Sequence, residues 1–187
     1  MIDIRKLKEL VRLMVENDLS ELDLKDQQET VTISGSGSGA FEDPKVGGGA
    51  VGYATCTLNR TTKQIDCTAR IYNIVDLIAA HLHVTGPGIA GPVALPIPNL
   101  PLRISNDFGL TWAWTESNLA RLPRQGINSM DDVLETCSSG NCYLNFHTVR
   151  NPDGEVRVNM CPDGRESNTI VAIDVCHPDR IPPTPTK

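Results

Sequence analysis

The chain has 187 residues, of which 40% are hydrophobic, a composition typical of a soluble globular protein with one ordinary domain and a small appendage. Its formal net charge of −6 and the lack of a long Lys/Arg cluster argue against binding to nucleic acid. No apolar run approaches the roughly 20 residues of a membrane-spanning helix, and the opening residues lack the apolar segment of a signal peptide.

Residues 1–34 are predicted to form one amphipathic helix followed by a β-hairpin. The helix is indicated by apolar residues at helical spacing, namely Ile4, Leu7, Val11, Met14 and Val15. The hairpin is indicated by alternation that places Leu22 and Leu24 on one face with Val31 and Ile33. A unit this small cannot bury its apolar faces alone, so we expect them to contact copies of the segment or another protein.

The order helix, "SELDL", acidic turn and "VTI" in this segment resembles the amino terminus of bacterial biotin carboxyl carrier proteins of acetyl-CoA carboxylase. In that family the segment associates with biotin carboxylase and with copies of itself. The resemblance therefore implies a homo-oligomer or a biotin carboxylase partner, and a cytoplasmic origin for residues 1–34. The family's biotin-accepting Lys lies between two Met residues, and no Met-Lys-Met occurs here, so no biotin is expected.

Strict Gly/Ser alternation over residues 35–39 predicts a flexible linker. All six cysteines follow it, which indicates an oxidising compartment for the second part only. Both observations favour a fusion of two proteins. The predicted organisation is a helix-hairpin segment at 1–34, a linker at 35–39, a β domain at 40–178 and a Pro-rich tail at 179–187.

The second part reads as short strands separated by Gly, Pro, Asn and Asp. This pattern predicts a mainly β fold, an antiparallel sandwich or barrel. The expected strands are 51–59, 64–75, 78–86, 92–97, 110–116, 141–149, 155–160 and 169–176. One helix is predicted over 128–137, with Ser129 suited to its start and two acidic residues in its first turn.

The cysteines fall in neighbouring pairs, each of which closes a local loop without crossing the core. This spacing predicts the disulfides Cys56–Cys67, Cys137–Cys142 and Cys161–Cys176. The alternative is a set of free core thiols in a cytosolic protein.

Alternation in three predicted strands separates apolar from polar side chains. His81 and His83 share one face of their strand, and the later strands place Asn145 with His147 and Glu155 with Arg157. If the three strands are neighbours, these side chains form one polar cluster.

Three interpretations of the cluster stay open. His81, His83 and His147 suit Zn²⁺ or Cu²⁺, because two ligands two apart on a strand and a third on the next strand can occupy three corners of a tetrahedron. Alternatively, Glu155 pairs with Arg157 or a histidine in a buried hydrogen-bonded network without metal. The third interpretation is a solvated face. The fourth histidine, His177, is interpreted as a loop residue.

The segments "AAHLHVTGPGIAGPVALPI" and "YLNFHTVRNPDGEVRVNM" resemble the CHRD domain, named from chordin, over about residues 50–175. The family pattern joins an H-x-H-G-P strand to an N-x-H-T strand and a G-E-x-R strand. The chain departs from it at Val84 and Thr85, which separate H-x-H from Gly-Pro, and at Asn159, where a small residue is usual. The resemblance implies an extracellular, all-β domain with a binding or structural role.

The leading hypothesis is therefore a non-catalytic extracellular CHRD-type binding or structural domain of unknown ligand, fused to an oligomerising segment. One alternative is a Cu/Zn dismutase-like β-barrel enzyme, and another is an acetyl-CoA carboxylase accessory segment that carries no biotin. An enzyme is the less favoured class, because no set of nucleophile, base and orienting residue emerges from the sequence.

Overall fold

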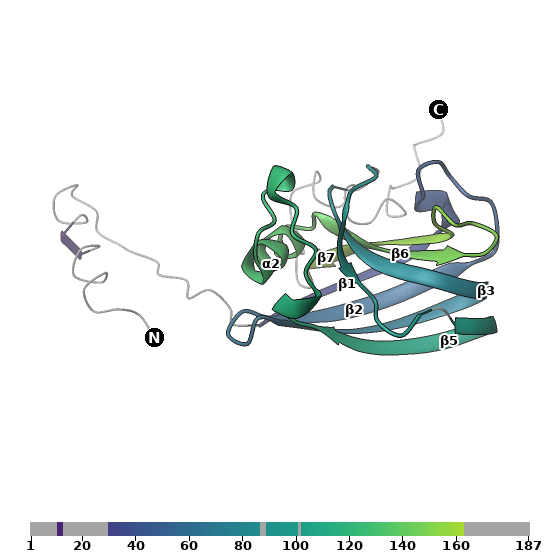
Figure 1. The fold of residues 1–187 in the computed structure, drawn as a ribbon, viewed down its shortest axis with the longest axis horizontal. Coiled ribbons are helices and arrows are strands. Elements are labelled where there is room, and N and C mark those ends of the chain that lie inside the picture. Colours follow the sequence, from purple (N-terminus) through teal and green to yellow (C-terminus); the bar gives the residue numbers. More distant parts are fainter. Residues whose placement is uncertain (1–10, 13–29, 87–88, 101, 163–187) are drawn as a thin grey trace, which may run out of the picture.

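The computed structural model describes residues 11–12, 30–86, 89–100 and 102–162, and in this part the protein is mostly β (Figure 1). The strands are β1 (Thr30–Ser38), β2 (Val51–Asn59), β3 (Gln64–Val84), β4 (Val93–Pro96), β5 (Leu102–Trp114), β6 (Cys142–Thr148) and β7 (Val156–Pro162). The helices are α2 (Met130–Ser138) and the 3₁₀ turns η1 (Gly39–Phe41), η2 (Glu116–Asn118) and η3 (Pro123–Gln125). The predicted fold class, an antiparallel sandwich or barrel with disulfides, is confirmed in its barrel form.

The barrel closes through the long strand β3. Neighbouring strands follow the order β2-β1-β7-β6-β3, and pairing of β2 with β3 completes the ring. The sequence predicted two strands, 64–75 and 78–86, where β3 is continuous. Asn73 lies within the first of these and Asp76 lies in the break between them. Both adopt positive φ, 56° and 52°, which these residue types tolerate, and they coincide with register shifts against β5.

Strand β1 corrects the expectation of a flexible linker at 35–39. Gly35 to Ser38 lie in β1, which pairs with β2 along its whole length and with β7 on its other side. A Cβ atom at Gly35 would overlap the carbonyl oxygen of Asn159, and one at Gly37 would overlap that of Arg157. Glycine is needed here because the backbone of β7 approaches closely, so the linker prediction is wrong.

Little of the predicted leading segment can be compared with the structure. Val11 and Arg12 are helical, as expected, whereas Leu22 and Leu24 of the predicted hairpin lie outside the described residues. The end of the segment belongs to β1, where Val31 pairs with Leu58 and Ile33 with Cys56 of β2. The boundary predicted after residue 34 therefore falls inside a strand of the barrel.

Two of the predicted disulfides are confirmed. Cys56–Cys67 joins directly paired positions of β2 and β3, and Cys137–Cys142 joins the end of α2 to the start of β6. Cys161 is also disulfide-bonded. Its predicted partner Cys176 lies outside the described residues, so that pairing stays a prediction.

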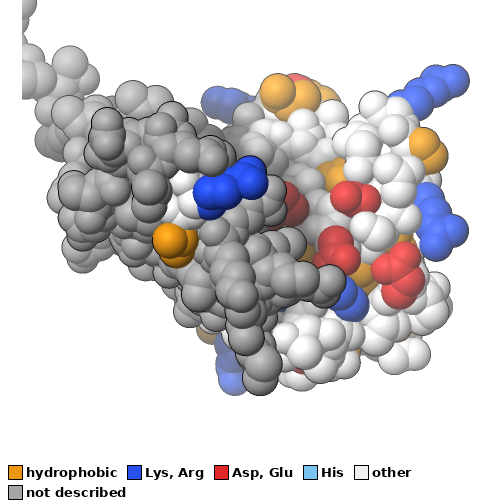
Figure 2. Space-filling model, turned by 90° about the vertical axis from the view of Figure 1, so that its left-hand side faces the viewer, with side chains coloured by type: hydrophobic (Ala, Val, Ile, Leu, Met, Phe, Trp, Pro, Cys, Tyr) orange, Lys and Arg blue, Asp and Glu red, His pale blue; other side chains and the backbone are white. Residues whose placement is uncertain are grey.

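Helix α2 packs against the barrel at the end shown on the left of Figure 1. Ser129 caps it as predicted: its side chain accepts from the Asp132 backbone N–H, and the Asp132 side chain accepts from the Ser129 N–H. The helix buries Met130, Val133, Leu134 and Cys137. Figure 2 shows acidic side chains gathered on this face, where Glu135 pairs with Arg60. Such exposed pairs contribute about 0–1 kcal/mol.

Candidate functional sites

The predicted polar cluster forms on the face shared by β3, β6 and β7. The three strands are neighbours, and their register places Asn145 between His81 and Arg157. At the next position on the same face of β6, Tyr143 lies between His83 and Asn159. The opposite face of the same strands carries the buried core residues Leu82, Leu144, Phe146, Val156 and Val158. Strict alternation thus separates a polar layer from the core.

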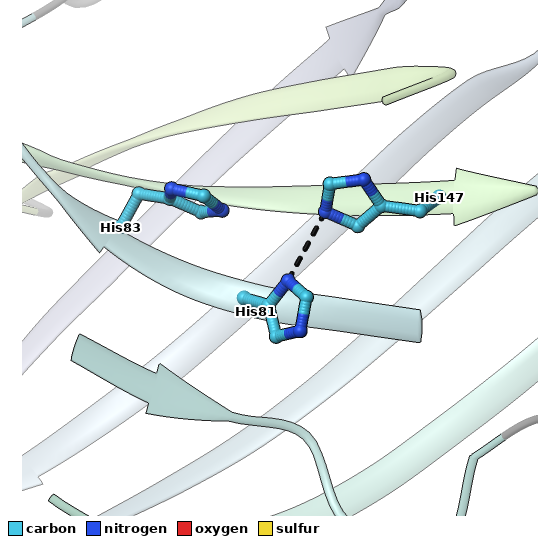
Figure 3. Close-up of side chains that lie close together, drawn as sticks. All are labelled: His81, His83 and His147. Carbon is cyan, nitrogen blue, oxygen red and sulfur yellow. Dashed lines mark hydrogen bonds between the residues drawn. The ribbon is translucent and has the colours of Figure 1, made fainter. Parts of the chain in front are cut away.

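The three histidines face one another across β3 and β6 (Figure 3). His81 Nδ1 lies 3.1 Å from His147 Nε2, and one candidate ligand nitrogen from each ring lies within 4.8 Å of the other two. His83 and His147 are each only 8% exposed. No other group of three or more His, Cys, Asp or Glu residues within the described ranges has comparable geometry.

Backbone carbonyls select the tautomers of two of these rings. His83 Nδ1 lies 2.8 Å from the Gly91 carbonyl oxygen, and His147 Nδ1 lies 3.0 Å from that of Pro152. A carbonyl only accepts, so each Nδ1 carries the hydrogen and each Nε2 presents a lone pair. His147 Nε2 accepts from His81, whereas the buried Nε2 of His83 has no hydrogen-bond partner.

The site keeps its imidazoles neutral near pH 7. Burial, reinforced by the neighbouring rings of His147 and His83, lowers the pKa of His81 from 6.5 to about 4. Burial also lowers the pKa of His83 and of His147. Desolvation disfavours the charged ring, and three adjacent cations would repel one another.

Arg157 has a positioning role beside the histidines. Its guanidinium carbon lies 3.5 Å from the Tyr143 ring centroid, and the His83 ring stacks on the same tyrosine at 4.7 Å. Arg157 also donates to the carbonyl oxygens of Gly86 and Ile89 and to the Asn159 side chain. These bonds hold the loop after β3 over the polar face, and Gly91 of that loop supplies the carbonyl that orients His83.

The expected pairing of Glu155 with Arg157 or a histidine is not found among the described residues. Glu155 instead accepts a hydrogen bond of 2.6 Å from the Thr148 hydroxyl. The carboxylates whose charges act on Arg157 are those of Glu42 and Asp43, and Glu42 is only 8% exposed. Glu42 lies in a loop without periodic pattern, so no sequence signal pointed to it.

Only one of the two carboxyl oxygens of Glu42 has a hydrogen-bond partner. Its Oε2 accepts from Asn145 Nδ2 at 3.2 Å, while its Oε1 and the Asn145 Oδ1 are buried without a hydrogen-bond partner. Burial raises the pKa of Glu42 from 4.5 to about 7, against the lowering effects of Arg157 and Asn145. A proton on Oε1 would allow it to donate to Asn145 and so satisfy both atoms.

A second candidate site is a groove of about 550 Å³ across β2, β3 and β5. Tyr53 and Arg70 occupy directly paired positions, and the Tyr53 ring lies edge-on to Tyr72 with centroids 6.2 Å apart. Tyr53 is 55% exposed, which is unusual for so large an aromatic side chain. Next to them, an exposed row of threonines crosses the three strands at Thr55, Thr68 and Thr111.

Gly109 leaves open space on the β5 side of this groove. It pairs with Arg70 from within β5, where a glycine normally weakens a strand. A Cβ atom there would meet only the Ala69 carbonyl oxygen, at 3.8 Å, so packing does not require glycine. Glycines of this kind often mark places where a ligand approaches the backbone.

Fold and site together define a disulfide-stabilised antiparallel β-barrel with a buried histidine-bearing face. The chain belongs to the CHRD domain family, whose model matches residues 31–159. The match begins inside β1 and so includes the Gly/Ser stretch in the domain. No curated protein and no solved structure matches the chain.

The family match suggests an extracellular binding domain, as CHRD domains are typically extracellular. Nothing in the comparisons supports the resemblance of residues 1–34 to biotin carboxyl carrier proteins, or a fusion. An oligomer or a biotin carboxylase partner likewise finds no support. In the described part of the chain, no helix has the length and apolar character needed to cross a bilayer.

Proposed function

We propose that this protein is a non-catalytic extracellular binding domain and that it binds an acidic oligosaccharide in the groove of β2, β3 and β5. The observation that carries the proposal is the exposed pair Tyr53 and Arg70 beside Gly109, a strand glycine that packing does not require. Family membership and two confirmed disulfides support the extracellular setting.

The groups in the groove suit a sugar that carries a negative charge. A tyrosine ring packs against the C–H face of a pyranose, and threonine hydroxyls both donate to and accept from sugar hydroxyls. A guanidinium binds a carboxylate or sulfate through two parallel hydrogen bonds. Within the described ranges Arg70 has no ion pair or hydrogen bond, so its donors remain available.

The groove offers binding groups rather than catalytic ones. Its lining residues include neither a carboxylate nor a histidine. Hydrolysis of a glycoside by the usual route needs a pair of carboxylates flanking the bond. A bound oligosaccharide would therefore be held and not cleaved.

Calorimetric titration with a uronic-acid oligosaccharide and a neutral oligosaccharide of equal length tests the proposal. We expect binding of the acidic ligand, and its loss in Gly109→Thr, because the added side chain fills the groove while favouring a strand. Arg70→Gln should reduce affinity for the acidic ligand to that for the neutral one.

Arg60→Gln is the matched control, since it removes the same charge at a site outside the groove. An equal loss in Arg60→Gln and Arg70→Gln would indicate unspecific attraction and contradict the proposal. So would undiminished binding by Gly109→Thr.

A further inference from the structure

We propose that His81, His83 and His147 form a binding site for one divalent transition-metal ion, Zn²⁺ or Cu²⁺. This inference goes beyond the binding function above and uses no residue of the groove. It stands on the convergence of three imidazoles from β3 and β6 and on a buried, unpartnered lone pair at its centre.

The spacing of the nitrogens fits a metal ion with a small ring movement. Zinc–nitrogen bonds of about 2.0–2.1 Å in tetrahedral geometry place neighbouring ligand nitrogens about 3.4 Å apart. His81 Nδ1 and His147 Nε2 are 3.1 Å apart, and the three candidate ligand atoms lie within 4.8 Å of one another. In Figure 3 one ring nitrogen of His83 points toward the other two rings, so a rotation of His83 would complete the set.

The surrounding carbonyls hold two rings in the form that a metal requires. A metal-binding histidine commonly donates its other N–H to a carbonyl or carboxylate, which fixes both tautomer and orientation. Gly91 does this for His83 and Pro152 does it for His147. Both Nε2 lone pairs are thereby directed into the cluster.

The unpartnered Nε2 of His83 distinguishes a metal site from a closed hydrogen-bond network. A buried acceptor without a partner has lost its hydrogen bond to water and gained nothing in return, which destabilises the fold. Network residues that could have met it are engaged elsewhere: Arg157 bonds Gly86, Ile89 and Asn159, and Asn145 bonds Glu42. A metal ion would supply the missing partner.

Binding needs one proton to move. His147 Nε2 has a lone pair, so His81 Nδ1 must carry the hydrogen of their shared bond. When the metal takes both nitrogens, that hydrogen leaves Nδ1 and His81 takes one from solvent at Nε2. The half-buried position of His81 leaves a path for this exchange, and no net proton is released.

The donor set selects the class of cation. Three neutral imidazoles suit Zn²⁺ and Cu²⁺, whereas Ca²⁺ and Mg²⁺ require oxygen ligands. Three protein ligands leave a fourth position for water or an outside ligand. The Asp153 carboxylate, whose charge acts on His147, partly balances the added positive charge.

Equilibrium dialysis against ZnCl₂, followed by elemental analysis of the oxidised full chain, tests the site. We expect one equivalent of zinc, and a loss of affinity of more than about 100-fold in His83→Phe, since losing a ligand costs more than losing an outer-shell partner. Phenylalanine keeps the stack on Tyr143. His177→Ala, which removes the remaining histidine of the four, is the matched control and should bind normally.

Imidazole ¹⁵N NMR of the unmutated protein gives a readout that does not depend on how a variant folds. Zinc should shift Nε2 of His83 and His147 and Nδ1 of His81, with His177 unchanged. Absence of stoichiometric zinc, equal loss in His177→Ala, or shifts confined to His177 would each overturn the assignment.

Discussion

At the scale of single residues, Glu42 is expected to make the protein less stable as the pH rises. Its pKa is 4.5 when exposed and about 7 in the fold, so between these values the folded state holds a proton that the unfolded state has released. The contribution of protonated Glu42 to the free energy of unfolding is complete below pH 4.5 and is lost as the pH rises to about 7. Glu42→Gln should therefore raise the free energy of unfolding at pH 8 by on the order of 2 kcal/mol, with little effect at pH 4.5.

Urea unfolding at the two pH values measures this difference. Glutamine also supplies an N–H that can donate to the unpartnered Oδ1 of Asn145. Glu135→Gln, which removes a carboxylate from the exposed face of α2, is the control and should not raise the free energy of unfolding at pH 8. An equal gain at pH 4.5 and pH 8 in Glu42→Gln would show that the carboxyl is not buried as described.

A second prediction at this scale tests whether the Gly/Ser stretch forms part of strand β1 or a flexible linker. Gly37→Ala should lower the free energy of unfolding by more than about 2 kcal/mol, because its Cβ would overlap the Arg157 carbonyl oxygen and push β1 from β7. Ser36→Ala, on the exposed neighbour, should stay within about 0.5 kcal/mol. Chemical denaturation of the two variants measures both changes in the free energy of unfolding. Equal tolerance of the two substitutions would indicate a flexible linker and contradict the strand.

At the scale of elements, β1 is expected to be essential to the barrel. A chain that begins at residue 40 lacks the strand between β2 and β7, and it exposes unpaired backbone groups on both. We expect this chain to lose cooperative unfolding and dispersed NMR spectra, while a chain that begins at Thr30 keeps both. A stable, cooperatively folded 40–187 fragment would restore the domain boundary expected from the sequence.

Local pattern predicted most strands, and it failed where distant contacts decide the conformation. Alternation predicted β2 at 51–59 and the polar and apolar faces of β6. The residue type of Ser129, followed by two acidic residues, predicted the cap of α2. The Gly/Ser alternation of β1 lacks the apolar side chains by which a strand is recognised in a sequence. Glycine is needed there because the backbone carbonyls of β7 approach closely, and this contact is visible only in the fold. Likewise Asp76 falls in the break between two predicted strands, although it lies inside the continuous strand β3.

The candidate sites show the same limit. The H-x-H spacing indicated that His81 and His83 share a face, and His147 joined them because β3 and β6 are neighbours. Glu42 reaches Asn145 from a loop far away in the sequence, so nothing local could reveal it. The expected Glu155–Arg157 pair failed because Glu155 precedes β7 and meets Thr148 instead.

At the scale of the whole molecule, the two disulfides with both cysteines in the described ranges fasten different parts of the barrel. Cys56–Cys67 spans 11 positions across the β2–β3 pairing that closes the ring, and Cys137–Cys142 spans 5 between α2 and β6. Chain entropy gives about 3 kcal/mol for the first loop and about 2 kcal/mol for the second. We expect Cys56→Ala/Cys67→Ala to lose more stability than Cys137→Ala/Cys142→Ala in urea unfolding under oxidising conditions.

Reduction with a thiol should lower the unfolding midpoint of the unmodified chain by more than either double variant. This follows because reduction removes both constraints, along with the bond that Cys161 makes. A disulfide across the strand pairing that closes the barrel suits the oxidising setting that the family match suggests. If the reduced chain unfolded at the same urea concentration as the oxidised one, the disulfides would be incidental and the extracellular assignment would lose its structural support.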